Sequence, residues 1–152
     1  MPNLLVLVSV LALQSQQLTA TELSLGADAV MAHRTFVGAE LGFAHRPSGE
    51  SRIALALAGG TNAERPAVHA QITLQLLLNP AARAGPGFYA GVGGAFSARH
   101  GSHGQGLLAV LLGCESAPGR RQGWYAELGF AGGVRAAAGW RARWFPNWWP
   151  GS

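Results

Sequence analysis

Residues 67–79, Ala-Val-His-Ala-Gln-Ile-Thr-Leu-Gln-Leu-Leu-Leu-Asn, alternate between apolar and polar side chains. The even positions from Val68 to Leu78 are all apolar, whereas the odd positions from His69 to Gln75 are polar. Leu77 is the one exception to the alternation. A period of two places successive side chains on opposite faces of an extended strand. The stretch therefore predicts a β-strand with one apolar and one polar surface.

The same alternation recurs in weaker form between Thr21 and Phe145, interrupted by turn residues such as those of Pro47-Ser48-Gly49. Strands of about ten residues with this pattern are typical of transmembrane β-barrels. We therefore predict an all-β fold, an eight-stranded antiparallel up-and-down transmembrane β-barrel with a polar, plugged lumen. The expected strands span residues 22–32, 36–46, 51–60, 67–79, 88–99, 104–115, 124–135 and 139–145, and the last could begin at Ala136.

The composition agrees with a single small barrel and excludes several functions. Only 12% of the 152 residues are charged, about half the usual share of a soluble domain. The net charge is +4, but no basic run with interleaved aromatic residues is present, so we expect no nucleic-acid partner. A single cysteine excludes an intrachain disulfide, and the five histidines are scattered, so no metal or other cofactor is expected.

The two ends of the chain have their own composition. Residues 4–13 are apolar and are followed by Gln-Ser-Gln-Gln, which predicts a signal peptide over 1–20; a buried N-terminal strand or helix is the alternative. The barrel would then occupy 21–145 and a short tail 146–152. Trp148 and Trp149 in this tail suit an interfacial anchor, a partner-binding segment or a disordered end.

Glycine and alanine dominate the positions expected to face the lumen, and the large side chains among them are charged. Because isolated charges there are costly, carboxylates and guanidiniums should pair across the barrel. We expect Glu40 and Glu127 to form the core of this network with Arg141 and Arg143. Arg99 is also expected to point inward. The complete predicted ion-pair network is Asp28, Glu40, Glu127, Arg135, Arg141 and Arg143.

Aromatic side chains expected on the exterior sort by depth into two groups, as in the girdles at the two interfaces of a membrane barrel. The group expected at the inner interface is Phe43, Phe88, Trp124 and Trp144. The group expected at the outer interface is Phe36, Phe96 and Trp140.

Residues 123–145 resemble the last hairpin of small outer-membrane barrels of the protein A/X type. Within them, Gly139-Trp140-Arg141-Ala142-Arg143-Trp144 resembles the terminal targeting signal of that family, with glycine five residues before a closing aromatic. The resemblance implies a location in the outer membrane of a Gram-negative envelope, contact with its lipids, and insertion by the barrel-assembly machinery. Members of such families have structural, adhesive, permeation and lipid-modifying roles, so the resemblance alone determines no activity.

Three functions are compatible with the sequence. Short connections on the expected outer side favour a non-enzymatic structural or envelope-integrity role without an identified small-molecule ligand. A soluble lipocalin-like barrel that binds an apolar ligand would require the aliphatic side chains to face inward. The third hypothesis is a lipid-modifying hydrolase, because His100, Ser102 and Glu115 loosely resemble the motif of outer-membrane lipid A deacylases. The expected register places Glu115 far from the His100 turn, so no catalytic residue is assigned.

Overall fold

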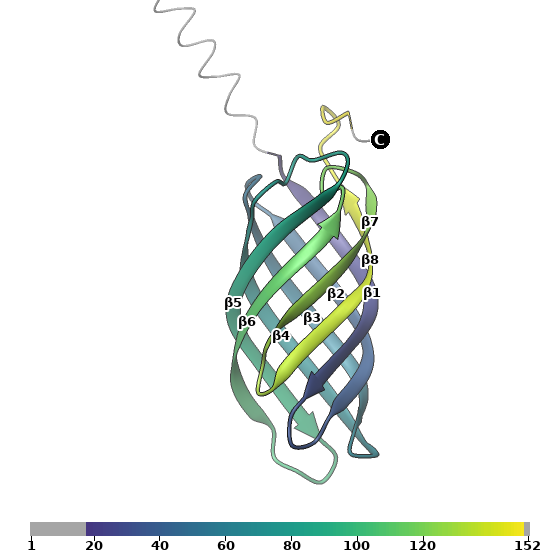
Figure 1. The fold of residues 1–152 in the computed structure, drawn as a ribbon, viewed down its shortest axis with the longest axis vertical. Helices are drawn as coiled ribbons and strands as arrows, with labels where there is room; N and C mark the ends of the chain where they lie inside the picture. The colour runs from purple at the N-terminus through teal and green to yellow at the C-terminus, as the bar shows by residue number, and fades with distance from the viewer. Residues whose placement is uncertain (1–17, 151–152) are drawn as a thin grey trace, which may run out of the picture.

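The computed structural model describes residues 18–150, which form a closed barrel (Figure 1). Each strand is antiparallel to its neighbours in chain order, and β1 pairs with β8 to close the barrel. The predicted all-β, eight-stranded, up-and-down fold is confirmed. The strands are β1 (Ala20–Met31), β2 (Phe36–Arg46), β3 (Ser51–Asn62), β4 (Arg65–Leu77), β5 (Pro86–Arg99), β6 (Gln105–Ser116), β7 (Gln122–Phe130) and β8 (Val134–Trp144).

The expected boundaries of the barrel and its flanks differ slightly from the described ones. Most of the expected signal peptide lies outside the described residues. Its last positions are described: Leu18 is buried and Ala20 is the first residue of β1. β8 ends at Trp144, and the expected tail, residues 146–152, is described to Pro150. Within residues 18–150, no helix has the length and hydropathy that crossing a membrane would require.

The apolar–polar alternation of β4 determines which of its side chains point outward and which point into the lumen. Leu74 is 54% exposed on the exterior, whereas its neighbour Gln75 is 2% exposed and faces the lumen. The exceptional Leu77 also faces inward, where it packs with Tyr89 and Leu111. Apolar side chains therefore cover the outside of the barrel and polar ones fill much of its inside.

The hairpin between β7 and β8 is the largest difference from the expected strand boundaries. We expected a strand to continue to residue 135, but β7 ends at Phe130 and β8 begins at Val134. Gly132, which has a φ of 75°, forms the turn, and the Ala131 N–H donates to the Gly133 carbonyl at 3.0 Å. A positive φ is readily adopted by glycine, so the Gly132-Gly133 pair ends the strand earlier than alternation alone indicates.

The connections at the two ends of the barrel differ in length. The terminal end, where β1 begins and β8 ends, carries connections 47–50, 78–85 and 117–121 (Figure 1). The longest connection is 78–85 at the terminal end, and the far end carries the connections 32–35, 63–64, 100–104 and 131–133, none longer than five residues. Ala63 and Glu64 both have positive φ, as a two-residue hairpin turn with the twist of its strands requires. All far-end connections are thus short, in agreement with the sequence pattern.

Close packing between strands predicts the effect of a methyl group at Gly93. A Cβ added there would lie 1.9 Å from the carbonyl oxygen of Ile72 on β4, so the backbone would have to shift. We expect Gly93→Ala to lower the free energy of unfolding by about 1–3 kcal/mol, measured by urea titration of the refolded protein. Gly106→Ala is the control, because nothing lies within 4 Å of its added Cβ. Equal losses of unfolding free energy in both variants would contradict the close packing of Gly93 against β4.

Candidate functional site

The lumen near the terminal end contains an arginine cluster, in which four guanidiniums surround two carboxylates. All six side chains are at most 5% exposed. They come from five strands, because every inward position of a narrow barrel points at the same axis. The members of the arginine cluster are Glu22, Arg46, Arg52, Glu115, Arg141 and Arg143.

Glu115 is the acceptor that the four arginines share. Its carboxylate lies 2.7 Å from Arg141 Nη1, 2.8 Å from Arg143 Nη2 and 3.1 Å from Arg52 Nη1. Arg46 Nη2 is 3.5 Å away and also forms an ion pair with Glu22 through its Nε. Such charge-assisted contacts are strong, and their loss leaves several buried cations without compensation.

The same arginines hold the connections that cover the terminal end. Arg46 Nη1 donates to the carbonyl of Pro80 at 3.3 Å and to that of Pro118 at 3.4 Å. Arg143 Nη1 donates to the carbonyl of Arg120 at 3.2 Å. The tail adds a further contact, because Trp149 Nε1 donates to the Gly119 carbonyl at 2.9 Å. The ion network therefore fixes the connections 78–85 and 117–121 over the lumen.

A second group, the Arg135 cluster, lies farther along the lumen and has the opposite charge balance. Arg135 forms ion pairs with Asp28 at 2.9 Å, with Glu127 at 2.8 Å and with Glu40. Neutral donors complete it: the Tyr125 hydroxyl donates to Glu40 at 2.9 Å, and the Tyr89 hydroxyl donates to Glu127 at 2.8 Å. His69 Nδ1 lies 2.8 Å from Asp28 Oδ2. One guanidinium here holds three carboxylates.

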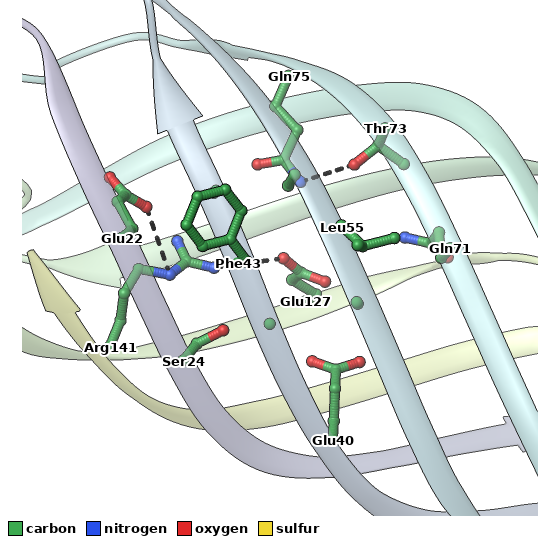
Figure 2. Close-up of a pocket in the computed structure, with 14 residues that line it drawn as sticks. Glu22, Ser24, Glu40, Phe43, Leu55, Gln71, Thr73, Gln75, Glu127 and Arg141 are labelled. Carbon is green, nitrogen blue, oxygen red and sulfur yellow. Dashed lines mark hydrogen bonds and ion pairs between the residues drawn. The ribbon is translucent and has the colours of Figure 1, made fainter.

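The net charges of the two clusters cancel. The arginine cluster holds four guanidiniums and two carboxylates, and the Arg135 cluster holds one guanidinium and three carboxylates, so the ten groups sum to zero charge. Arg141 joins them, since its Nη2 lies 3.8 Å from Glu127 and its Nε 3.6 Å from Glu22 (Figure 2). In a medium of low dielectric, adjacent groups of opposite net charge attract and stabilise the filled lumen.

Little free space remains between the clusters. The cavity lined by Glu22, Gln71, Thr73, Glu127 and Arg141 has a volume of about 20 Å³ (Figure 2). A water molecule needs at least about 10–15 Å³ of such space. The cavity thus admits about one water molecule, and a solute cannot pass it without rearrangement of the charged side chains.

The pairing expected from sequence was partly wrong. Glu127 does approach Arg141, but Glu40 pairs with Arg135, and Arg143 pairs with Glu115 and Glu22. The reason is the register between β1 and β8, in which Arg143 is the direct partner of Glu22. Barrel closure thereby brings Arg143 to the terminal end, away from Glu40.

Four members of the network were not predicted from the sequence: Glu22, Arg46, Arg52 and Glu115. The signal was present, because alternation along β2 and β3 places both arginines on the inward face. Their position next to the 47–50 turn obscured this. Arg99, in contrast, lies at the far end and is only partly buried.

Six of the seven selected aromatic residues lie on the exterior, each between 45% and 56% exposed: Phe43, Phe88, Phe96, Trp124, Trp140 and Trp144. The expectation for Phe36 was wrong. It is 2% exposed and its ring centroid lies 5.9 Å from that of His69 in the lumen, because even positions of β2 face inward. The location of the six exterior aromatic residues at membrane interfaces stays a prediction.

The separation of Trp124 and Trp140 into opposite groups was also wrong. The two residues are direct partners in the pairing of β7 with β8, so they share one depth. The cause is the early turn at 131–133, which moves Trp140 to the middle of its strand.

The arrangement expected of a hydrolase is not formed. His100 and Ser102 lie in the 100–104 connection at the far end, whereas Glu115 belongs to the arginine cluster near the other end of β6. The facing required of a lipocalin-like barrel is not found either, since Leu128 is 60% and Trp144 56% exposed. Among residues 18–150, no group of three or more His, Cys, Asp or Glu side chains is placed to hold a metal ion.

These features define a class: a small closed barrel of eight up-and-down strands with an apolar exterior and an ion-paired interior, like the small outer-membrane barrels that the sequence resembles. No family model matches the chain, and no curated protein matches it in sequence. Among solved structures, the N-terminal β-barrel domain of OprF from Pseudomonas aeruginosa is similar, with a TM-score of 0.65 and 12% identity. The match covers 82% of this chain and 97% of that one, so the two share a fold.

Proposed function

We propose that this chain is an integral protein of the bacterial outer membrane, with a structural, non-enzymatic role in the envelope. The observation that carries the proposal is the exterior, where large apolar side chains are exposed on every one of the eight strands, among them Leu25, Leu74, Leu112 and Leu128. An apolar surface that encircles the barrel favours lipid acyl chains over water. An even number of strands puts the beginning of β1 and the end of β8 on one side of the membrane, which we assign to the periplasm.

Fractionation tests the location. We expect the full chain, expressed in a Gram-negative host, to stay with outer membranes through washing with urea or carbonate and to require detergent for release. Release without detergent would contradict the proposed membrane location and favour a soluble barrel.

The structural role is supported by the filled lumen and the short far-end connections, which offer neither a pore nor a large display surface. A strain that lacks the protein should show increased envelope permeability to detergents or large antibiotics, and the complete chain should restore the barrier. Unchanged permeability under envelope stress would contradict an envelope-integrity role.

The filled lumen predicts the conductance of the purified barrel. Since the cavity between the charge clusters admits about one water molecule, we expect no large steady conductance in planar bilayers. Arg141→Ala removes the side chain that joins the two clusters, and openings should become more frequent in this variant. Arg83→Ala, in the exposed 78–85 connection, is the control. A large steady conductance of the unaltered protein would overturn the closed lumen.

A further inference from the structure

The far end of the barrel contains a second cavity, with a volume of about 270 Å³. It lies beyond the Arg135 cluster, between connections 32–35, 100–104 and 131–133. Unlike the lumen between the clusters, it is large enough for a small solute or a headgroup. The polar residues that line it include His33, Arg34, Asn62, His69, Arg99 and His103.

The charge of this cavity has one sign. Arg34 and Arg99 both line it, and none of the described residues in its wall is Asp or Glu. In the lumen, by contrast, each buried arginine contacts at least one carboxylate. Arg34 and Arg99 form no ion pair with any carboxylate of residues 18–150. Two guanidiniums without counter-ions beside a cavity that opens at the barrel mouth attract an anion.

His69 supplies an independent observation in the wall of the same cavity. It is 3% exposed, and its Nδ1 is engaged by Asp28 at 2.8 Å. Its Nε2 is buried and has no hydrogen-bond partner among the described residues. A buried polar atom without a partner is destabilising, so an ordered water that donates to Nε2 from the cavity side would satisfy it.

We infer that this far-end cavity binds a phosphomonoester group, with Arg34 and Arg99 as its main ligands. The donors approach from different sides: Arg34 from connection 32–35, Arg99 from the end of β5, and His103 from connection 100–104. A tetrahedral dianion with three terminal oxygens can accept from all of them, whereas a planar carboxylate is satisfied by one guanidinium fork. The group can belong to a soluble glycerol or sugar phosphate or to a lipid headgroup.

Calorimetry with the refolded full chain in a neutral maltoside detergent tests this inference independently of the membrane location. We expect glycerol 1-phosphate to bind more tightly than acetate at equal ionic strength. The double variant Arg34→Gln/Arg99→Gln should weaken binding by about tenfold or more, since it removes two charge-assisted contacts.

Two single variants are matched controls for charge. Arg83→Gln and Arg121→Gln both replace exposed arginines in connections at the terminal end, away from the cavity. Both should retain the affinity for glycerol 1-phosphate within about twofold. Equal losses in the controls and the double variant, or equal binding of acetate and glycerol 1-phosphate by the unaltered protein, would overturn the site.

A second arm separates the two sources of the phosphate. Barrels in phosphatidylcholine nanodiscs that contain phosphatidic acid can be analysed for lipid retained after delipidation. Retention by the unaltered chain and loss in the double variant indicate a lipid headgroup, whereas binding of glycerol 1-phosphate alone indicates a soluble ligand. Binding in neither arm overturns the inference.

Should the double variant not refold, nuclear magnetic resonance of the unaltered protein replaces it. Glycerol 1-phosphate should then shift the guanidinium signals of Arg34 and Arg99 selectively. Equal shifts of the guanidinium signals of Arg83 and Arg121 would overturn the inference.

Discussion

Replacement of Arg135 by glutamine is expected to lower the free energy of unfolding by about 3–5 kcal/mol, because it leaves three buried carboxylates without their shared cation. Those carboxylates are Asp28, Glu40 and Glu127, each at most 9% exposed. Urea titration of the refolded barrel, followed by tryptophan fluorescence, measures the effect.

Two further variants test the origin of this loss. Arg83→Gln, on an exposed connection, should change the free energy of unfolding by no more than about 0.5 kcal/mol. Adding Glu40→Gln to Arg135→Gln should recover part of the stability, since one unpaired carboxylate is removed. If Arg135→Gln behaved like Arg83→Gln, Arg135 would not be what balances these carboxylates.

Glu115→Gln is expected to have an effect of similar size, about 3–5 kcal/mol, since four buried arginines would retain Glu22 as the sole carboxylate of their cluster. The connections at the terminal end should respond as well. Arg46 and Arg143, which both contact Glu115, donate to carbonyls of connections 78–85 and 117–121, so amide hydrogen exchange in these connections should accelerate.

Glu50→Gln is the matched control for this variant, because Glu50 is an exposed carboxylate on connection 47–50 of the same end. It should leave both the stability and the exchange rates nearly unchanged. Loss of stability without faster exchange in 78–85 and 117–121 would show that the arginines do not fix these connections.

For most residues, the sequence predicts whether the side chain points outward or into the lumen, because this orientation depends on the alternation of apolar and polar residues within one strand. Leu74 and Gln75 differ by one position, and the pleat alone sends them to opposite surfaces. The same rule identifies Arg135 as inward, although its strand was assigned wrongly. It also sends Phe36 inward, and the error there came from treating a strand end as exterior.

The partners of the lumen charges could not be predicted in the same way. The pairing of Glu40 with Arg135 joins residues 95 positions apart, on β2 and β8. Their meeting depends on the register of the closing β1–β8 pair and on the turn at 131–133. A displacement of this turn by a few residues, as between the expected and the described β8, shifts every residue of the last strand along the barrel axis.

The sequence by itself determined the fold class, the number of strands and the apolar exterior, since a period of two is a property of each strand alone. Tertiary structure decided which charges meet, how the lumen divides into an arginine cluster and an Arg135 cluster, and where the unpaired cations gather at the far end. The physical reason is that closure adds the registers of all hairpins together, so the contacts across the lumen are set by the whole barrel.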